Sequence, residues 1–338
     1  MGRSARVRVI VSAGGVLLLL TALLFGLRFF SNTLIPFPID PDGNPVSDES
    51  LRWFHDAARK INDRHGDAAL LSLIGKNGLQ KAWYLCASTA ACAGTQTPEK
   101  ISTLTTRSEN GTTCYDLDGG KIVTLDRRFA DVGQFSEGLA VVCLGRAKEG
   151  DGTGPYRLAF ADREGRLLAD GEFNGATPFS GGVSAVAVRS GTGLKWGVID
   201  KQGAWRCEPK YDEMFAFSEG LAGANICPPD GGTAEQAGLV NDRGEFVLVF
   251  PKGHTVCSSP HEGRVLVRSG AGYQLADTSG RVLVSLDNRW SHVGPFSCGR
   301  ACVFNGKRNG YIDLQGRLVV PPKYRIATPY INGTAFVR

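Results

Sequence analysis

The sequence predicts an all-β repeat domain made of β-hairpin repeats, preceded by an N-terminal transmembrane helix and a short helical segment. Its 44 glycines are spread along 338 residues, which indicates many turns between short strands rather than long helices. Two short glycine-containing phrases return in alternation over the last two thirds of the chain, and an aromatic residue returns with them. Three marks in register indicate a repeat array.

The first phrase is Phe-Ser-x-Gly followed by an apolar strand. Its clear copies are Phe135-Ser-Glu-Gly138, Phe179-Ser-Gly-Gly182, Phe217-Ser-Glu-Gly220 and Phe296-Ser-Cys-Gly299, and weaker copies contain Gly263 and Gly333. The six glycines are 44, 38, 43, 36 and 34 residues apart. A glycine between two short apolar runs is typical of a hairpin turn.

The second phrase is Asp-x-x-Gly. It occurs at Asp162–Gly165, Asp200–Gly203 and Asp313–Gly316, with further copies at Asp116–Gly119, Asn241–Gly244 and Asp277–Gly280. In such a turn the aspartate accepts hydrogen bonds from backbone N–H groups two residues on, and the glycine adopts a positive φ. Because these aspartates recur at one turn position, we expect them to be structural rather than catalytic.

The third mark is an aromatic residue six positions before most of the Phe-Ser strands. The aromatics are Phe129, Phe173, Tyr211, Trp290 and Tyr324. A single hairpin is marginally stable in water, so the units must stack on one another. We expect these aromatics and the phenylalanines of the first phrase to fill the space between units.

One copy carries all of these features together. Lys195-Trp196-Gly197-Val-Ile-Asp200-Lys-Gln-Gly203 is followed by Glu208-Pro-Lys-Tyr211 and Phe217-Ser-Glu-Gly220. This unit resembles that of the WG-repeat (KWG-repeat) family, and the resemblance covers roughly residues 112–338. It implies an all-β repeat domain, often in bacterial surface or signalling proteins, with no general catalytic residues to carry over.

The array begins and ends with half a unit. A turn half-unit surrounds Asp116–Gly119, a strand half-unit ends the chain around Tyr330–Val337, and five units lie between. Complementary halves at the two ends favour a propeller-like ring closed by pairing of its termini. An open β-solenoid remains the alternative, because each unit shows three strands rather than four.

Four segments follow from these patterns. We expect a transmembrane anchor at 1–30, a proline-rich linker at 31–49, a small helical or irregular preface at 50–109, and the WG-like β-repeat domain at 110–338. Val9 to Leu27 contains no charge over nineteen residues, a length that nearly spans a bilayer. A cleaved signal peptide is the alternative, although its apolar stretch is usually shorter and ends at small residues.

Charge gives the expected orientation and argues against one class of partner. Arg3, Arg6 and Arg8 precede the apolar run and Arg28 follows it, so we expect the N-terminus inside and the repeat domain outside, periplasmic or extracellular. Residues 1–30 hold these four cations and no acid, so the rest of the chain carries 5 − 4 = +1. A nucleic-acid-binding domain is usually basic, and we therefore expect no nucleic acid as partner.

The candidate reactive residues form no recognisable site. Nine cysteines are present, of which Cys86 and Cys92 could close a short disulfide loop. His254, Cys257 and His261 have zinc-ligand chemistry but lack a fourth ligand in the sequence, and Asp40, Asp42 and Asp48 fail the spacing of a calcium loop. An Asp-Gly turn explains the latter better, and we predict no catalytic, cofactor-binding or metal site.

These observations predict a non-enzymatic, single-pass membrane protein that acts as a binding or scaffolding module in the cell envelope. Its expected partners are the membrane, through the N-terminal helix, and another envelope protein or polymer. The alternative is an envelope enzyme, hydrolase-like, that uses one face of a propeller-like ring. A third possibility is a purely mechanical spacer.

Overall fold

The chain folds into small antiparallel β-sheets. The computed structural model describes residues 37–46, 105–108, 111–116, 121–146, 155–168, 172–191, 193–228, 232–270, 272–286, 288–330 and 333–338, and every regular element within these ranges is a strand. No helix of membrane-spanning length and apolarity occurs among these residues. The expected anchor at 1–30 and nearly all of the expected preface at 50–109 lie outside the described residues.

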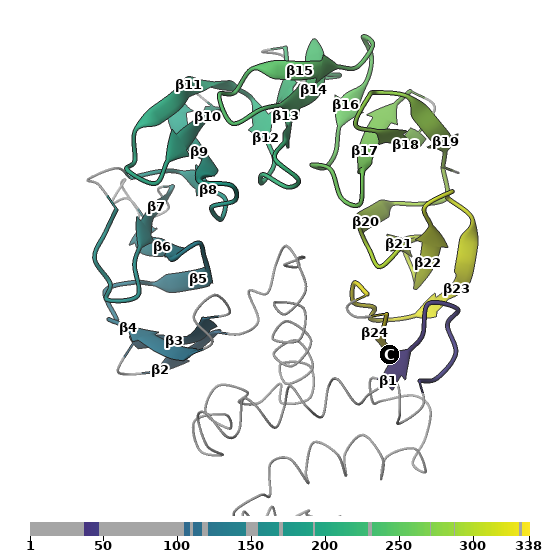
Figure 1. Cartoon of the computed structure of the whole chain (residues 1–338), viewed down its shortest axis with the longest axis horizontal. Helices are drawn as coiled ribbons and strands as arrows, with labels where there is room; N and C mark the ends of the chain where they lie inside the picture. Colours follow the sequence, from purple (N-terminus) through teal and green to yellow (C-terminus); the bar gives the residue numbers. More distant parts are fainter. Residues whose placement is uncertain are drawn as a thin grey trace, which may run out of the picture.

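Five consecutive sheets form blades in a β-propeller arrangement (Figure 1). The first blade contains β5 (Asp131–Ser136), β6 (Leu139–Arg146) and β7 (Tyr156–Ala161). The second contains β8 (Gly175–Ala176), β9 (Val183–Ser190), β10 (Gly193–Asp200) and β11 (Trp205–Tyr211). The third contains β12 (Glu213–Met214), β13 (Ala222–Ile226), β14 (Gln236–Val240) and β15 (Phe246–Val249).

The last two blades follow the same order. The fourth contains β16 (Thr255–Val256), β17 (Arg264–Ser269), β18 (Gly272–Asp277) and β19 (Val282–Ser285). The fifth contains β20 (His292–Ser297), β21 (Arg300–Phe304), β22 (Asn309–Asp313) and β23 (Leu318–Tyr324). Neighbours in sequence are neighbours in each sheet, and the fourth strands β11, β15, β19 and β23 lie at the outer rim (Figure 1).

The expectation of three strands per unit is therefore wrong for four of the five blades. The strand that the sequence pattern missed is the outer one, which follows the Asp-x-x-Gly turn. Its short apolar runs, such as Phe246–Val249 in β15 and Val282–Ser285 in β19, do not by themselves indicate which sheet edge they join. In the first blade this place is taken by an isolated bridge between Ala161 and Leu167.

Two further sheets, one of three strands and one of two, flank the five blades. One contains β2 (Thr105–Ser108), β3 (Gly111–Asp116) and β4 (Lys121–Leu125). The other pairs β1 (Phe37–Ile39) with β24 (Ala335–Val337), with Phe37 opposite Val337 and Ile39 opposite Ala335. The two ends of the described chain thus meet in one sheet, which we call the composite sheet (Figure 1).

The composite sheet corrects the expected closure. The terminal half-unit does not pair with the half-unit at Asp116, because β3 pairs with β2 and β4. Its partner is β1, which lies within the segment expected to be a linker. The physical reason is that residues 39–43, Ile-Asp-Pro-Asp-Gly, repeat the Ile-Asp-x-x-Gly pattern of residues 199–203. The segment therefore supplies the strand and turn that the C-terminal half-unit lacks.

Each hydrophobic core lies between two neighbouring sheets. One cluster joins β3 and β4 to the first blade through Cys114, Phe129 and Phe135, and another joins the second and third blades through Val198, Tyr211 and Phe217. A cluster containing Ile39, Tyr311 and Tyr330 joins the composite sheet to the fifth blade. Stacking of units therefore buries the apolar side chains that one thin sheet leaves exposed.

Candidate functional site

The strand order brings both recurring turns to the same end of the array. Successive strands of a blade are antiparallel and hydrogen-bonded, so chain reversals alternate between its two ends. The Phe-Ser-x-Gly turn joins strands one and two, and the Asp-x-x-Gly turn joins strands three and four. We call this end the turn face, and the opposite end, where strands two and three are joined, the hairpin face.

The Asp-x-x-Gly turns share one geometry. Asp200 Oδ1 accepts hydrogen bonds from the N–H groups of Gln202 (2.9 Å) and Ala204 (3.0 Å), and Gly203, with φ 78°, donates to the carbonyl of Asp200 (2.9 Å). The same pattern surrounds Asp162, Asp277 and Asp313, and Asn241 replaces the aspartate in the third blade. These side chains are occupied by their own turns.

Hydrogen bonding to these carboxylates also changes their acidity. The pKa of Asp277 is lowered, mainly by the hydroxyl of Ser279 and then, against partial burial, by backbone N–H groups of the turn. Burial opposes the shift at Asp313, but the backbone N–H and guanidinium of Arg317 outweigh it and lower the pKa. The carboxylates are therefore held ionised as acceptors, which is the opposite of what a general acid requires.

The Phe-Ser-x-Gly turns place an unusual residue on the turn face. The residue before the glycine has a positive φ in four blades, at Glu137 (53°), Glu219 (54°), Glu262 (51°) and Cys298 (53°). Because the following glycine is also left-handed, each is a two-residue type I′ turn. Asparagine or glycine usually takes this first position, so a glutamate there needs a compensating contact.

That contact is a hydrogen bond to the next blade. Glu137 accepts from the N–H groups of Gly181 (2.6 Å) and Gly182 (3.0 Å), and it also pairs with Lys201 Nζ (2.9 Å). Glu219 accepts from Gly263 (3.1 Å) and Glu262 from Gly299 (2.8 Å). A carboxylate of one turn therefore binds the backbone of the same turn in the following blade.

Electrostatics agree with this linking role at Glu137. Partial burial by itself raises the pKa, but the Lys201 ammonium and the N–H groups of Gly182 and Gly181 outweigh it, so the pKa lies below its usual value. The serine of the same phrase also bonds to the following sheet in the first and fifth blades. Ser136 Oγ donates to the carbonyl of Phe179 (2.6 Å), and Ser297 Oγ donates to that of Tyr330 (2.5 Å).

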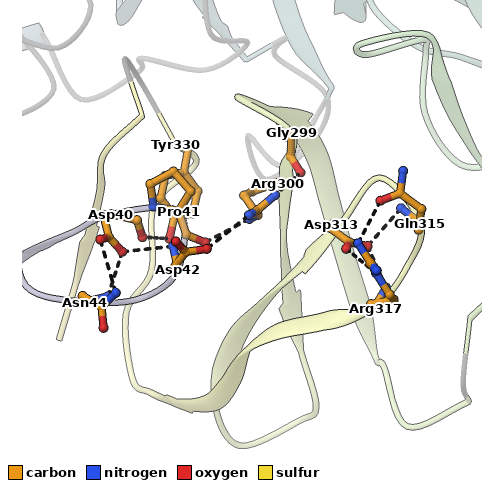
Figure 2. Close-up of polar contacts among 10 residues, drawn as sticks. All are labelled: Asp40, Pro41, Asp42, Asn44, Gly299, Arg300, Asp313, Gln315, Arg317 and Tyr330. Atoms are coloured by element: carbon orange, nitrogen blue, oxygen red, sulfur yellow. Dashed lines mark hydrogen bonds and ion pairs between the residues drawn. The ribbon is translucent and has the colours of Figure 1, made fainter.

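At the composite sheet the turn face is assembled from both ends of the chain (Figure 2). Asp40 Oδ1 accepts from the N–H groups of Asp42 (3.0 Å) and Asn44 (2.9 Å), as Asp200 does in its own turn. Tyr330 Oη donates to the carbonyl of Asp40 (2.7 Å), and Arg300 Nε donates to that of Pro41 (2.9 Å). Arg300 also lies 3.7 Å from Asp42.

The remaining repeat residues have packing roles. Phe135, Phe179, Phe217, Phe296, Tyr211 and Tyr324 are buried, and Gly138, Gly182, Gly220, Gly299, Gly165 and Gly316 have positive φ. Trp196 lies over Gly175 of β8. At Gly197 and Gly310 a β-bulge brings the third strand so close to the fourth that a Cβ would meet the carbonyl oxygen of Cys207 or Val320. A glycine after the Trp196 position is thus required by the bulge.

A family model described as "WG containing repeat" matches residues 160–189, 196–226 and 310–338. The chain therefore contains WG repeats in these three segments. The second and third matches begin at the bulged third strands described above.

Solved structures similar to this protein include a protein of unknown function from Bacteroides caccae, which is 16% identical with a TM-score of 0.34 and 69% of this chain and 96% of that chain covered. Kluyveromyces lactis Hsv2p is 14% identical with a TM-score of 0.38 over 62% and 76% of the two chains. The extracellular domain of a one-component system protein from B. thetaiotaomicron is 11% identical with a TM-score of 0.39 over 70% and 35%. None of the curated proteins matches this chain significantly.

The residues with zinc-ligand chemistry do not converge in this protein. His254 Nδ1 faces the carbonyl of Pro251 (3.0 Å), its Nε2 faces Gln274 (3.3 Å), and Cys257 donates to the carbonyl of Thr255 (3.6 Å). Among the described residues, no three His, Cys, Asp or Glu side chains form a group able to hold a metal ion.

Seven of the nine cysteines are described, and these seven are free thiols. Burial raises the pKa of Cys114 and Cys302 to about 12, with Asp116 adding to the shift at Cys114. Burial likewise raises the pKa of Cys257 to about 11. These thiols are therefore poor nucleophiles at neutral pH. Cys86 and Cys92, for which a disulfide was considered, lie outside the described part of the chain.

Sequence reasoning missed two features of the turn face. The linking role of Glu137, Glu219 and Glu262 was not predicted, although a glutamate before glycine in three copies was a visible signal. The turn at Asp40 was recognised as an Asp-Gly turn but not as a copy of the repeat. Its match to residues 199–203 was the signal that could have identified it.

Proposed function

We propose that this protein is a non-enzymatic, membrane-anchored binding or scaffolding module of the cell envelope. The observation that carries the proposal is the use of the repeated polar residues. The carboxylates of Glu137, Glu219 and Glu262 bind backbone N–H groups of the next blade, and those of Asp162, Asp200 and Asp313 bind their own turns. The repeated polar residues therefore hold the array together. This is expected of a scaffold whose partner contacts surface residues that differ from one unit to the next.

The anchoring part of the proposal rests on residues 1–30. Their nineteen uncharged residues and the excess of arginine before them support a single-pass helix with the N-terminus inside and the repeats outside. A phosphatase reporter that is active only outside the cytoplasm, fused after Arg338, is expected to be active. The same fusion without residues 1–30 serves as the control, and an inactive fusion to the whole chain would overturn the orientation.

Binding can be tested on the intact protein in its native membrane. Photoreactive residues are placed singly at exposed positions, such as Val247 on the outer rim and Gln202 on the turn face. We expect one envelope component to be captured from neighbouring positions on one surface and not from the others. The hydrolase alternative would instead be supported if neutralising one exposed carboxylate abolished turnover of an envelope polymer while thermal unfolding stayed unchanged.

A further inference from the structure

The two ends of the array differ in charge. Exposed cations lie on the hairpin face, at or just beyond the end of the second strand: Arg146, Arg189, Arg268, Lys307 and Arg338. They belong to the first, second, fourth and fifth blades and to the composite sheet. In the third blade this hairpin instead carries the exposed acid Glu235. On the turn face, the turns between strands one and two contain the acids Glu137, Glu219 and Glu262. The Asp-x-x-Gly turns of the same face contain both acids and exposed cations, and Arg166 and Arg281 pair there with the aspartates of their own turns.

The acids near the hairpin face do not cancel its positive charge. Glu172 is paired with Arg157, and Asp212 with Lys195 at 2.6 Å, so each of these acids is balanced by a further cation of the same face. Asp131 and Glu213, at the starts of β5 and β12, are exposed at the same end. A net charge of +1 for residues 31–338 therefore conceals a separation of charge between two ends of one body.

The described chain also begins at the hairpin face. β24 follows the turn at Gly333, so Ala335 lies toward the turn face and Val337 toward the hairpin face. In the antiparallel register Phe37 is opposite Val337, so β1 begins at the hairpin face and runs toward the Asp40 turn. Phe37, the first described residue, therefore lies at the hairpin face.

We infer that the hairpin face docks on the surface of an anionic phospholipid bilayer. The inference rests on the proposed anchor in residues 1–30 and goes beyond it by stating which face lies against the membrane. From Phe30 to Phe37 the chain reaches at most about 25 Å, which keeps β1 near the bilayer. Each cation close to an anionic surface strengthens binding about fivefold, and the acids of the turn face disfavour the opposite orientation.

The test uses the full chain in proteoliposomes of phosphatidylcholine, with or without phosphatidylglycerol. A photoreactive residue replaces Ser190 on the hairpin face or, as the matched position in the same blade, Gln202 on the turn face. We expect lipid adducts from position 190 to exceed those from position 202 at least tenfold, and to increase when phosphatidylglycerol is present. The inference would be overturned if both positions gave equal amounts of adduct, or if the amount of adduct did not increase with phosphatidylglycerol.

Charge reversal provides the second measurement. Arg146→Glu, Arg189→Glu and Arg268→Glu together should reduce the adduct at position 190 to its level in phosphatidylcholine alone. The control combines Arg166→Glu, Arg243→Glu and Arg281→Glu, which alters net charge equally at exposed turn-face positions and should leave the adduct unchanged. Thermal unfolding checks that both variants remain folded. Equal effects of the two triple variants, or binding to a DNA duplex in place of vesicles, would count against lipid docking.

Failure of docking and failure of anchoring give different results. If alkaline carbonate extracts the full chain from the proteoliposomes, the proposed anchor is wrong. The extracted chain can then be floated with vesicles, and flotation with phosphatidylglycerol but not with phosphatidylcholine alone would still support docking by the hairpin face. A chain that resists extraction but gives no difference between positions 190 and 202 keeps the anchor and loses the docking inference.

Discussion

The second blade and the composite sheet form the same kind of structure from differently connected chain segments. In the second blade, β8 to β11 follow one another in sequence, and β9 and β10 share a register of eight residue pairs. In the composite sheet, β24 and β1 share three pairs and come from opposite ends of the described chain. Continuity brings consecutive strands together at low entropic cost, whereas the composite sheet must close a loop of almost the whole domain.

Side-chain contacts at the composite sheet offset part of that cost. Tyr211 in the second blade donates its hydroxyl to Gly244 of the next blade (2.6 Å), and Tyr330 donates to Asp40 across the composite sheet (2.7 Å). Arg300 adds a bond to Pro41, as Figure 2 shows. One repeat unit can therefore be divided between two chain segments far apart in sequence if its turn and its interblade contacts are kept.

The largest expected effect comes from removing the buried tyrosines. Tyr330→Ala and Tyr211→Ala each delete a fully buried ring, and we expect each to lower the free energy of unfolding by about 3–5 kcal/mol. Hydrogen exchange should distinguish them, because Tyr330→Ala should release residues 37–46 selectively while Tyr211→Ala should not. The Phe variants keep the ring and should lose only about 1 kcal/mol. Equal protection of residues 37–46 in both Ala variants would contradict the comparison.

A smaller effect is expected from the turn aspartates. Asp40→Ala and Asp200→Ala each remove an acceptor of two backbone N–H groups, which should cost about 1–2 kcal/mol in urea denaturation. Asp40→Ala should also raise the hydrogen exchange of β1, because only three pairs hold that strand. Replacement by Asn, as found naturally at Asn241, is the control and should retain most of the stability.

The carboxylate of Glu137, which links two blades, should make thermal stability depend on pH, whereas the link at the composite sheet should not. The pKa of Glu137 in the folded protein lies below the value of 4.5 for a free glutamate. Its stabilising contribution is therefore complete above about pH 4.5 and is lost as the pH falls through the lower folded pKa. Glu137→Gln should flatten the dependence of thermal stability on pH below 4.5. At the fifth blade, beside the composite sheet, Cys298 holds this position, and Cys298→Ser should leave the profile unchanged.

The smallest effect is expected at the exposed arginines of the Asp-x-x-Gly turns. Arg317 pairs with Asp313 at 2.7 Å, but its side chain is 76% exposed. We expect Arg317→Ala to change the free energy of unfolding by less than about 0.5 kcal/mol. A loss above 1 kcal/mol would show that this ion pair, rather than the backbone N–H bonds, holds the turn. Asp313→Ala provides the comparison, because it removes both the ion pair with Arg317 and the hydrogen bonds from the backbone N–H groups.

Much of the array could be predicted because its signals are local. Turn chemistry at Asp200 and Gly203 depends on residues within five positions, and an aromatic such as Tyr211 must be buried in a thin sheet. A fourth strand in four of the blades was missed because a short apolar run, such as Phe246–Val249, does not by itself indicate which sheet edge it joins. The glutamate links were missed because their acceptors are about 40 residues away from their donors in sequence, as between Glu137 and Gly182.

The repeat unit, its two turns and the residues that each turn needs can be read from the sequence, because they follow from backbone geometry over a few residues. Which segment completes the last unit depends on how the whole array folds. β1 and β24 lie almost 300 residues apart, and their pairing depends on the curvature accumulated by all the blades between them. The separation of charge between the turn face and the hairpin face was likewise decided in three dimensions, since strand direction assigns each charged residue to its end.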